Sequence, residues 1–134
     1  MKSLAKMVQQ VAVACVAVFL VVSAVFFNAS DASAANITIK MGTAKGLAFE
    51  PAVATIQPGD TVTWEVGALP PHNVQFDKTP GDAALAASLS HKGLEGAGKS
   101  FSVSFPADAP AGEYSYFCMP HRGAGMVGKI IVAS

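Results

Sequence analysis

The sequence carries no excess of charge of either sign, and it has few of the residues that bind metals or form disulfides. Lysine and arginine together number nine, as do aspartate and glutamate, so the formal net charge is zero. Nucleic-acid-binding proteins usually carry a basic stripe, and none is present here, which argues against nucleic acid as a partner. Only two cysteines and three histidines occur among the 134 residues. Any disulfide or histidine-rich metal site would have to be built from very few side chains.

The first 34 residues have the pattern of a secretory signal peptide. Lys2 and Lys6 give a positive amino-terminal region, Val11–Phe27 form an apolar core, and residues 32–34 form an A-x-A cleavage motif. We therefore expect residues 1–34 to be removed, leaving one domain of 100 residues, 35–134. A retained membrane anchor is the alternative, but the apolar run is short for a span. The absence of a twin arginine favours export of an unfolded chain that acquires metal afterwards.

Removal of this segment leaves a single cysteine. Cys15 lies in the apolar core of the signal and would be lost with it, so Cys118 has no partner for an intrachain disulfide. The same removal leaves seven basic and eight acidic residues, a net charge near −1. A lone thiol in an oxidising compartment needs protection, and coordination as a metal-bound thiolate would supply it.

Residues 35–134 show the pattern of an all-β sandwich, because no long helical period appears and short runs alternate apolar with polar residues. These runs are 37–41, 62–66 and 101–105, and turn signals lie at 58–60, 79–82 and 110–112. One segment differs: Ala83–Leu89 is rich in alanine and leucine and follows Asp82, a good N-cap, so we expect a short helical turn there. No internal repeat or interdomain linker is found.

Four side chains with metal-binding atoms occur at a defined spacing. Cys118, His121 and Met126 make the run C-x2-H-x4-M, and His72 lies 46 residues before the cysteine. Two imidazoles, a thiolate and a weak axial thioether suit an ion that alternates between Cu(I) and Cu(II). Each residue alone would more often be a packing residue. Zinc is the competing metal, but structural zinc sites do not use a thioether. The set therefore predicts transfer of one electron.

The alternation of side chains also indicates how these ligands meet. Tyr114, Tyr116 and Cys118 share one face of a strand, so the sulfur points inward if the tyrosines do, and Phe117 points outward. Met126 opens the last expected strand, 127–133, on the core side. His72 comes from a separate connection that two prolines stiffen. Two loops at one end of the sandwich would thus converge on one ion.

The residues around these ligands form five recognisable motifs. They are L-A-F-E-P at 47–51, P-G-D-T-V-T-W at 58–64, P-H-N at 71–73, F-P-A-D-A-P-A-G-E-Y at 105–114 and Y-S-Y-F-C-M-P-H-R-G-A-G-M-V-G-K at 114–129. These motifs resemble the plastocyanins, in particular the cyanobacterial type, among the small blue-copper proteins or cupredoxins. The resemblance implies a Greek-key β-sandwich of about eight strands with one short helical turn. It also implies a soluble, monomeric electron carrier with one copper ion, rather than an enzyme.

The resemblance further implies roles for residues near the ligands. Asn73 corresponds to the asparagine that ties the histidine loop to the cysteine loop. The alternative interpretation is that Asn73 is an ordinary turn residue. His121 corresponds to the ligand whose ring edge reaches the surface. The apolar rim around it, the electron port for partners, corresponds to Leu47, Pro71, Gly123 and Ala124. Arg122 corresponds to an arginine that orients partners through its charge; its alternative is an ordinary surface arginine.

By the same resemblance, the donor is cytochrome f of the cytochrome b6f complex and the acceptor is photosystem I, in the thylakoid lumen. A respiratory terminal oxidase is a second candidate acceptor. The contacts with these membrane complexes would be peripheral and transient. The chain lacks the acidic clusters of plant plastocyanins: Asp77, Asp82 and Glu95 are scattered, Phe117 replaces a surface tyrosine, and Met119 makes the port more apolar.

Two other classes of function are alternatives for a chain with these ligands. A copper carrier or storage protein would offer exposed cysteine or methionine ligands that exchange metal readily. A one-domain copper oxidase or reductase would need further histidines for a second copper. Only His91 is unassigned, and we expect it to be a solvated surface residue.

Overall fold

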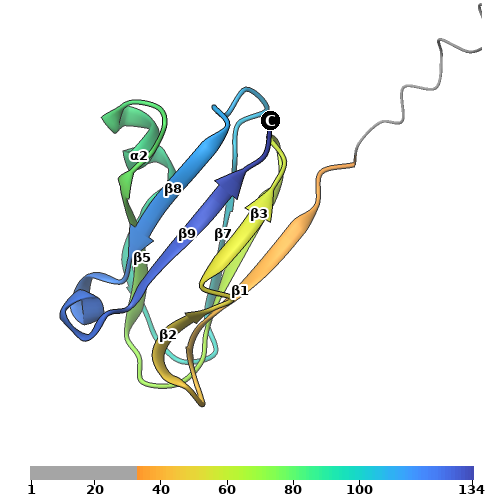
Figure 1. Cartoon of the computed structure of the whole chain (residues 1–134). Coiled ribbons are helices and arrows are strands. Elements are labelled where there is room, and N and C mark those ends of the chain that lie inside the picture. Colours follow the sequence, from red (N-terminus) through yellow and green to blue (C-terminus); the bar gives the residue numbers. More distant parts are fainter. Residues whose placement is uncertain (1–32) are drawn as a thin grey trace, which may run out of the picture. The chain divides into compact units, whose positions relative to one another are not determined.

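Nine strands in two sheets make up most of residues 33–134, the part of the chain that this computed structural model describes (Figure 1). Apart from residues 33 and 34, the predicted signal peptide lies outside the described residues. The strands are β1 (Asn36–Thr43), β2 (Gly46–Glu50), β3 (Val53–Ile56), β4 (Thr61–Val66), β5 (His72–Lys78), β6 (His91–Glu95), β7 (Ser100–Ser104), β8 (Gly112–Phe117) and β9 (Val127–Val132). Two short helices, α2 (Ala83–Leu89) and the 3-10 helix η1 (Met119–Ala124), interrupt them.

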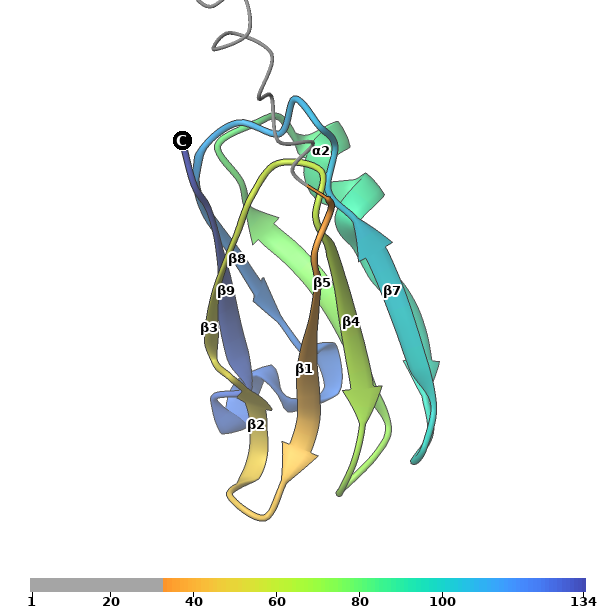
Figure 2. The same ribbon diagram turned by 90° about the vertical axis from the view of Figure 1, so that its right-hand side faces the viewer.

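The two sheets pack face to face as a sandwich (Figure 2). One has the strand order β2-β1-β4-β7 and the other β3-β9-β8-β5-β6. The pairs β1/β4 and β3/β9 are parallel and the other pairs are antiparallel. The predicted all-β sandwich is therefore confirmed, with nine strands where about eight were expected.

Alternating apolar residues of both sheets build the core. Ile39 and Met41 of β1 and Val62 and Trp64 of β4 are fully buried. The same alternation in β7 gives only half-buried side chains at Phe101 and Val103, because β7 is an edge strand with a neighbour on one side alone.

Helix α2 begins where the sequence predicted. Asp82 is its N-cap, and its carboxylate accepts a hydrogen bond of 2.9 Å from the backbone N–H of Leu85. Leu89, at the other end, is buried against the core. Neither this helix nor any other described helix is long and apolar enough to cross a membrane.

Three connections gather at the end of the sandwich opposite α2. Figure 2 shows the β1–β2 hairpin, the β4–β5 connection and η1 together at this end. Pro120 lies in the first turn of η1, where a missing N–H costs nothing, and Gly125 ends the helix with a φ of 84°. The sequence predicted a loop here but not its helical form. This end carries the candidate site.

Candidate metal centre

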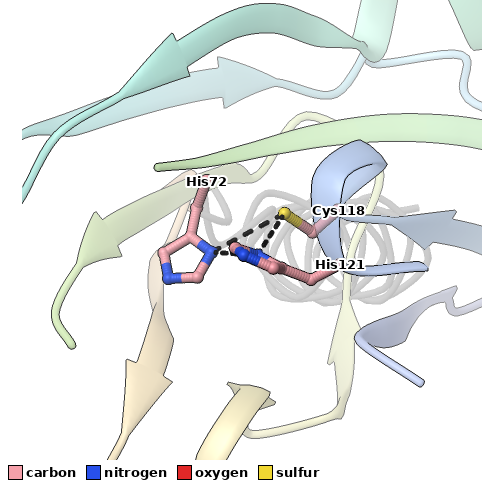
Figure 3. A group of neighbouring side chains, drawn as sticks. All are labelled: His72, Cys118 and His121. Carbon is pink, nitrogen blue, oxygen red and sulfur yellow. Dashed lines mark hydrogen bonds between the residues drawn. The ribbon is translucent and has the colours of Figure 1, made fainter. Parts of the chain in front are cut away.

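Three of the four predicted ligands converge at this end of the sandwich. His72 is the first residue of β5, Cys118 follows β8, and His121 lies in η1. The Cys118 sulfur is 3.6 Å from His72 Nδ1 and 3.5 Å from His121 Nδ1, and the two nitrogens are 3.2 Å apart (Figure 3). The centre of such a triangle lies roughly 2 Å from each corner, close to a typical metal–nitrogen bond length in proteins. The three donors therefore fit one metal ion.

The ligands differ in their access to solvent. Cys118 and His72 are fully buried, whereas His121 is half-buried. Of the two imidazoles, that of His121 is thus the one with an edge at the surface, as the resemblance implied for an electron port.

Met126 is fully buried next to the other two ligands of its loop. Its backbone N–H donates to the His121 carbonyl at 3.2 Å, and its carbonyl accepts from the Cys118 N–H at 3.1 Å. These two bonds close the loop on itself and fix the spacing of Cys118, His121 and Met126.

A backbone carbonyl sets the tautomer of His72. The Nε2 of His72 lies 2.8 Å from the carbonyl oxygen of Ala68, which can only accept, so Nε2 carries the proton and Nδ1 is free for the metal. This close approach of the Ala68 carbonyl to the His72 ring requires a glycine at position 42. A Cβ on Gly42 would overlap the Ala68 carbonyl and lie 2.7 Å from His72 Nε2, and Gly42 has a φ of 71°. Sequence reasoning did not identify Ala68 or Gly42; a glycine inside an alternating strand was the available signal.

Asn73 joins the two loops that carry the ligands. Its side-chain oxygen accepts from the backbone N–H of Met119 at 2.8 Å, and its amide nitrogen donates to the Lys92 carbonyl at 3.1 Å. The residue is fully buried, so both bonds are shielded from water. Asn73 therefore holds the start of η1 against β5 and β6.

The surroundings shift the acidity of two ligands. Burial raises the pKa of the Cys118 thiol, and the backbone N–H groups of Asn73 and His121 oppose this in part. Burial, together with neighbouring His72, lowers the pKa of His121 and so favours the neutral imidazole that binds metal. The thiol, in contrast, must lose a proton when metal binds.

Apolar residues are exposed at the same end of the molecule. Pro71, Gly123 and Ala124 are exposed, whereas Leu47 is half-buried and packs against the core. Two larger exposed apolar residues belong to the connections that carry the ligands: Leu69 is 56% exposed and Met119 is 52% exposed. Sequence reasoning missed Leu69, although its place just before Pro70-Pro71-His72 could have identified it.

Arg122 is held by contacts within the protein. Its guanidinium donates to the Asp77 carboxylate at 2.7 Å and stacks over the Phe117 ring at 3.9 Å from the centroid. Both partners lie in the sheet, in β5 and β8, so the side chain fastens η1 to the sandwich. Its side chain is still 55% exposed, which leaves its charge accessible to a partner.

His91 differs from the expectation of a solvated surface residue. Its ring stacks on Phe101 with 3.9 Å between centroids, its Nε2 lies 2.9 Å from a Glu95 carboxylate oxygen, and its side chain is only 32% exposed. The apolar stack and the carboxylate hold the ring against the sandwich.

Comparisons with known proteins place the chain in a family. A family model described as copper binding proteins, plastocyanin/azurin family, matches residues 35–133. The chain therefore belongs to the plastocyanin/azurin family of copper-binding proteins. Family membership and the converging donors identify copper as the metal that this site fits.

Three individual plastocyanins are similar to this chain. The plastocyanin of Nostoc punctiforme is 49% identical over 137 residues, which cover 98% of this chain and 99% of that protein. The plastocyanin of Synechococcus sp. (strain JA-2-3B'a(2-13)) is 55% identical over 111 residues, covering 81% and 82%. The oxidised plastocyanin of Dryopteris crassirhizoma has the same fold, with a TM-score of 0.62 at 24% identity, covering 72% of this chain and 99% of that one. The resemblance to the plastocyanins is thus confirmed.

Proposed function

We propose that this chain is a soluble photosynthetic electron carrier whose single type 1 copper ion is held by His72, Cys118, His121 and Met126. The observation that carries the proposal is the convergence of one sulfur and two imidazole nitrogens, all within 3.6 Å of one another. When bound, copper supplies a one-electron couple between Cu(I) and Cu(II). The thioether of Met126 would be the weak axial ligand.

The residues of the chain prepare the site for rapid transfer. The Ala68 carbonyl fixes the His72 ring, Asn73 fixes the cysteine loop, and Arg122 fastens η1 to the sheet. Ligands held this firmly rearrange little when the charge of the site changes. Burial of Cys118 and His72 excludes water from the inner side, while the edge of His121 faces partners.

The optical spectrum of the copper-loaded protein tests the metal assignment. We expect an intense blue band from thiolate-to-Cu(II) charge transfer, and Cys118→Ser should abolish it because a hydroxyl is a poor soft ligand. Met119→Leu is the matched control, since Met119 is exposed and its replacement is apolar. A blue band retained in Cys118→Ser would exclude Cys118 as the ligand.

We further propose the thylakoid lumen as the location of the mature chain, residues 35–134, after removal of the signal peptide. Cytochrome f would be the donor, photosystem I the acceptor, and a respiratory terminal oxidase a second acceptor. The plastocyanin relatives support photosynthetic partners, and the exposed apolar residues around His121 offer a dry contact. The charge of Arg122 would steer the approach.

Flash kinetics with photosystem I across a salt series test the docking residues. Arg122→Glu should alter the association rate mainly at low salt, because exposed charges act over a Debye length of roughly 8 Å at physiological ionic strength. Leu47→Ala should slow transfer within the docked complex at every salt concentration. If Arg122→Glu matches the wild type at low salt, Arg122 has no steering role.

Two features argue against the other classes of function. A storage or delivery protein needs ligands that exchange metal, but Cys118 and His72 are fully buried. A copper oxidase or reductase would need a further histidine site. Among residues 33–134 the remaining histidine is His91, which stacks on Phe101 and bonds to Glu95.

A further inference from the structure

A buried carboxylate lies at the end of the sandwich away from the copper site. Asp60, in the turn between β3 and β4, is only 6% exposed. One carboxylate oxygen accepts from the backbone N–H of Gln57 at 2.8 Å, and the other accepts from the backbone N–H of Ala35 at 2.7 Å. Among residues 33–134, none of the ion pairs includes Asp60. Within the part of the chain that the structure describes, the carboxylate therefore has two neutral donors and no countercharge.

A buried charge without a countercharge is costly, because neutral hydrogen bonds replace only part of the lost hydration. The function described above does not use Asp60, so its burial needs another explanation. The donor at 2.7 Å provides one, because Ala35 is the first residue after the predicted cleavage site.

Ala35 is firmly placed beside Asp60. Its carbonyl accepts from the N–H of Thr61 at 2.9 Å, and the next residue, Asn36, is in register with Thr61 in the parallel pair of β1 and β4. These contacts hold the Ala35 nitrogen at the carboxylate whether or not a residue precedes it. The family match also begins at residue 35.

We propose that Asp60 is the binding site for the α-ammonium group of a mature chain that begins at Ala35; the proposal rests on the removal of residues 1–34. An export endopeptidase hydrolyses the Ala34–Ala35 peptide bond with one water, which leaves a carboxylate on Ala34 and an amine on Ala35. The amine takes up a proton from solvent at neutral pH. A neutral amide N–H thereby becomes a cation within hydrogen-bond distance of Asp60.

Only one start of the mature chain places its ammonium group at Asp60. Cleavage one residue earlier or later would move the new ammonium by about 3.3 Å along the strand, beyond direct contact with the carboxylate. Cleavage after Ala34 thus completes the fold by supplying the missing countercharge. The described residues from 35 onward contain every strand and all of the buried apolar core.

A double-mutant cycle on the copper-loaded protein tests the pair. Chains that begin at Ala35 are compared with chains that begin at Ser33, each with Asp60 or with Asp60→Asn, by denaturant unfolding. Asparagine keeps the shape and one acceptor, so a merely structural role would give the same loss in both backgrounds. We expect Asp60→Asn to raise the unfolding equilibrium constant about tenfold more in the Ala35 chains, the size of a charge-assisted hydrogen bond. Equal losses in both backgrounds would overturn the proposal.

A second measurement needs no substitution at Asp60. In the Ala35 chain the α-amine, paired with Asp60, should acylate at neutral pH about fivefold more slowly than the α-amine of the Ser33 chain, because only the unprotonated amine reacts. Equal rates would overturn the proposal. Amino-terminal sequencing of the protein from the native cell tests the processing itself, and any start other than Ala35 would refute it. None of these outcomes affects the blue optical band. They therefore test the pair of Ala35 and Asp60 independently of the copper site.

Discussion

Gly42 shows how a single absent side chain controls the chemistry of a ligand. The Ala68 carbonyl reaches His72 Nε2 only because no Cβ occupies the space between β1 and the β4–β5 connection. The bond keeps the proton on Nε2 and leaves Nδ1 facing the Cys118 sulfur. One glycine thereby sets both the orientation and the tautomer of a ligand.

Gly42→Ala should therefore strain the backbone at residue 42 and, in addition, disturb the copper site. Gly46 is the matched control, because it also has a positive φ, 99°, but an added Cβ would meet nothing within 4 Å. Both variants carry the left-handed penalty of about 1–2 kcal/mol. Only Gly42→Ala should also change the visible spectrum and the reduction potential. Equal effects of the two substitutions on the spectrum would remove Gly42 from the site.

The raised pKa of Cys118 predicts a proton release on metal binding. The buried thiol is protonated in the metal-free protein at neutral pH, whereas the thiolate is the ligand. Zinc binding at pH 7 should release about one proton, and its affinity should rise about tenfold per pH unit between about pH 7 and 8. Calorimetry in buffers of different ionisation enthalpy measures the release, with Cys118→Ser as the control. Release of no proton would show that the thiolate already exists in the metal-free protein.

At the scale of elements, β8 carries the chain from the core to the site. Tyr114 and Tyr116 point inward from it and Cys118 follows on the same face, all three fully or almost fully buried. The two tyrosines differ in one respect. The Tyr114 hydroxyl donates to the Pro110 carbonyl at 2.7 Å. Among the described residues, the Tyr116 hydroxyl makes no hydrogen bond of standard geometry, and its polar neighbour is the indole N–H of Trp64.

Removing each hydroxyl should consequently have different effects. Tyr114→Phe loses a hydrogen bond and leaves the Pro110 carbonyl without this donor, so it should lower the free energy of unfolding by roughly 1–2 kcal/mol. Tyr116→Phe removes a buried hydroxyl that makes no hydrogen bond of standard geometry among the described residues, so it should cost less than Tyr114→Phe. Denaturant unfolding of the two variants measures the contrast. A larger loss for Tyr116→Phe would reveal a partner for its hydroxyl.

The elements that the sequence predicted are those with a strong local pattern. β1 and β4 alternate apolar and polar residues, and α2 follows a capping aspartate. β6 was not predicted because its residues are mostly polar, include Gly93, and form a strand only by pairing with β5 at the sheet edge. Strand formation there depends on a distant partner, which local patterns do not reveal.

The functional site likewise has residues that the sequence predicted and contacts that it did not. The ligands were predictable from their types and spacing, since few residue types bind copper. The Ala68 carbonyl was not, because every residue has a carbonyl. The Asp77 partner of Arg122 lies 45 residues away in the chain, and only the fold brings the two together.

At the scale of the whole molecule, most of the core consists of residues other than the metal ligands. Buried apolar residues of both sheets form one cluster, to which the site contributes Cys118 and Met126. Stability should thus come mainly from packing, unlike zinc fingers, which need their metal to fold.

The metal-free protein is therefore expected to remain folded. Near-ultraviolet circular dichroism and dispersed amide resonances should persist after copper removal. Copper at about a thousand times its dissociation constant should add roughly 4 kcal/mol and raise the melting temperature by well over 10 °C for a domain of this size. Loss of the dispersed spectrum without copper would refute this account.

The place of β9 in its sheet has a consequence for how the protein is made. β9 is the last of the described strands along the chain, yet it lies between β3 and β8 rather than at an edge. A chain still leaving the ribosome lacks this strand, so its second sheet would be split and Met126 would have no support. A truncated copy would neither close its sandwich nor hold copper firmly. Incomplete copies would therefore carry no electrons.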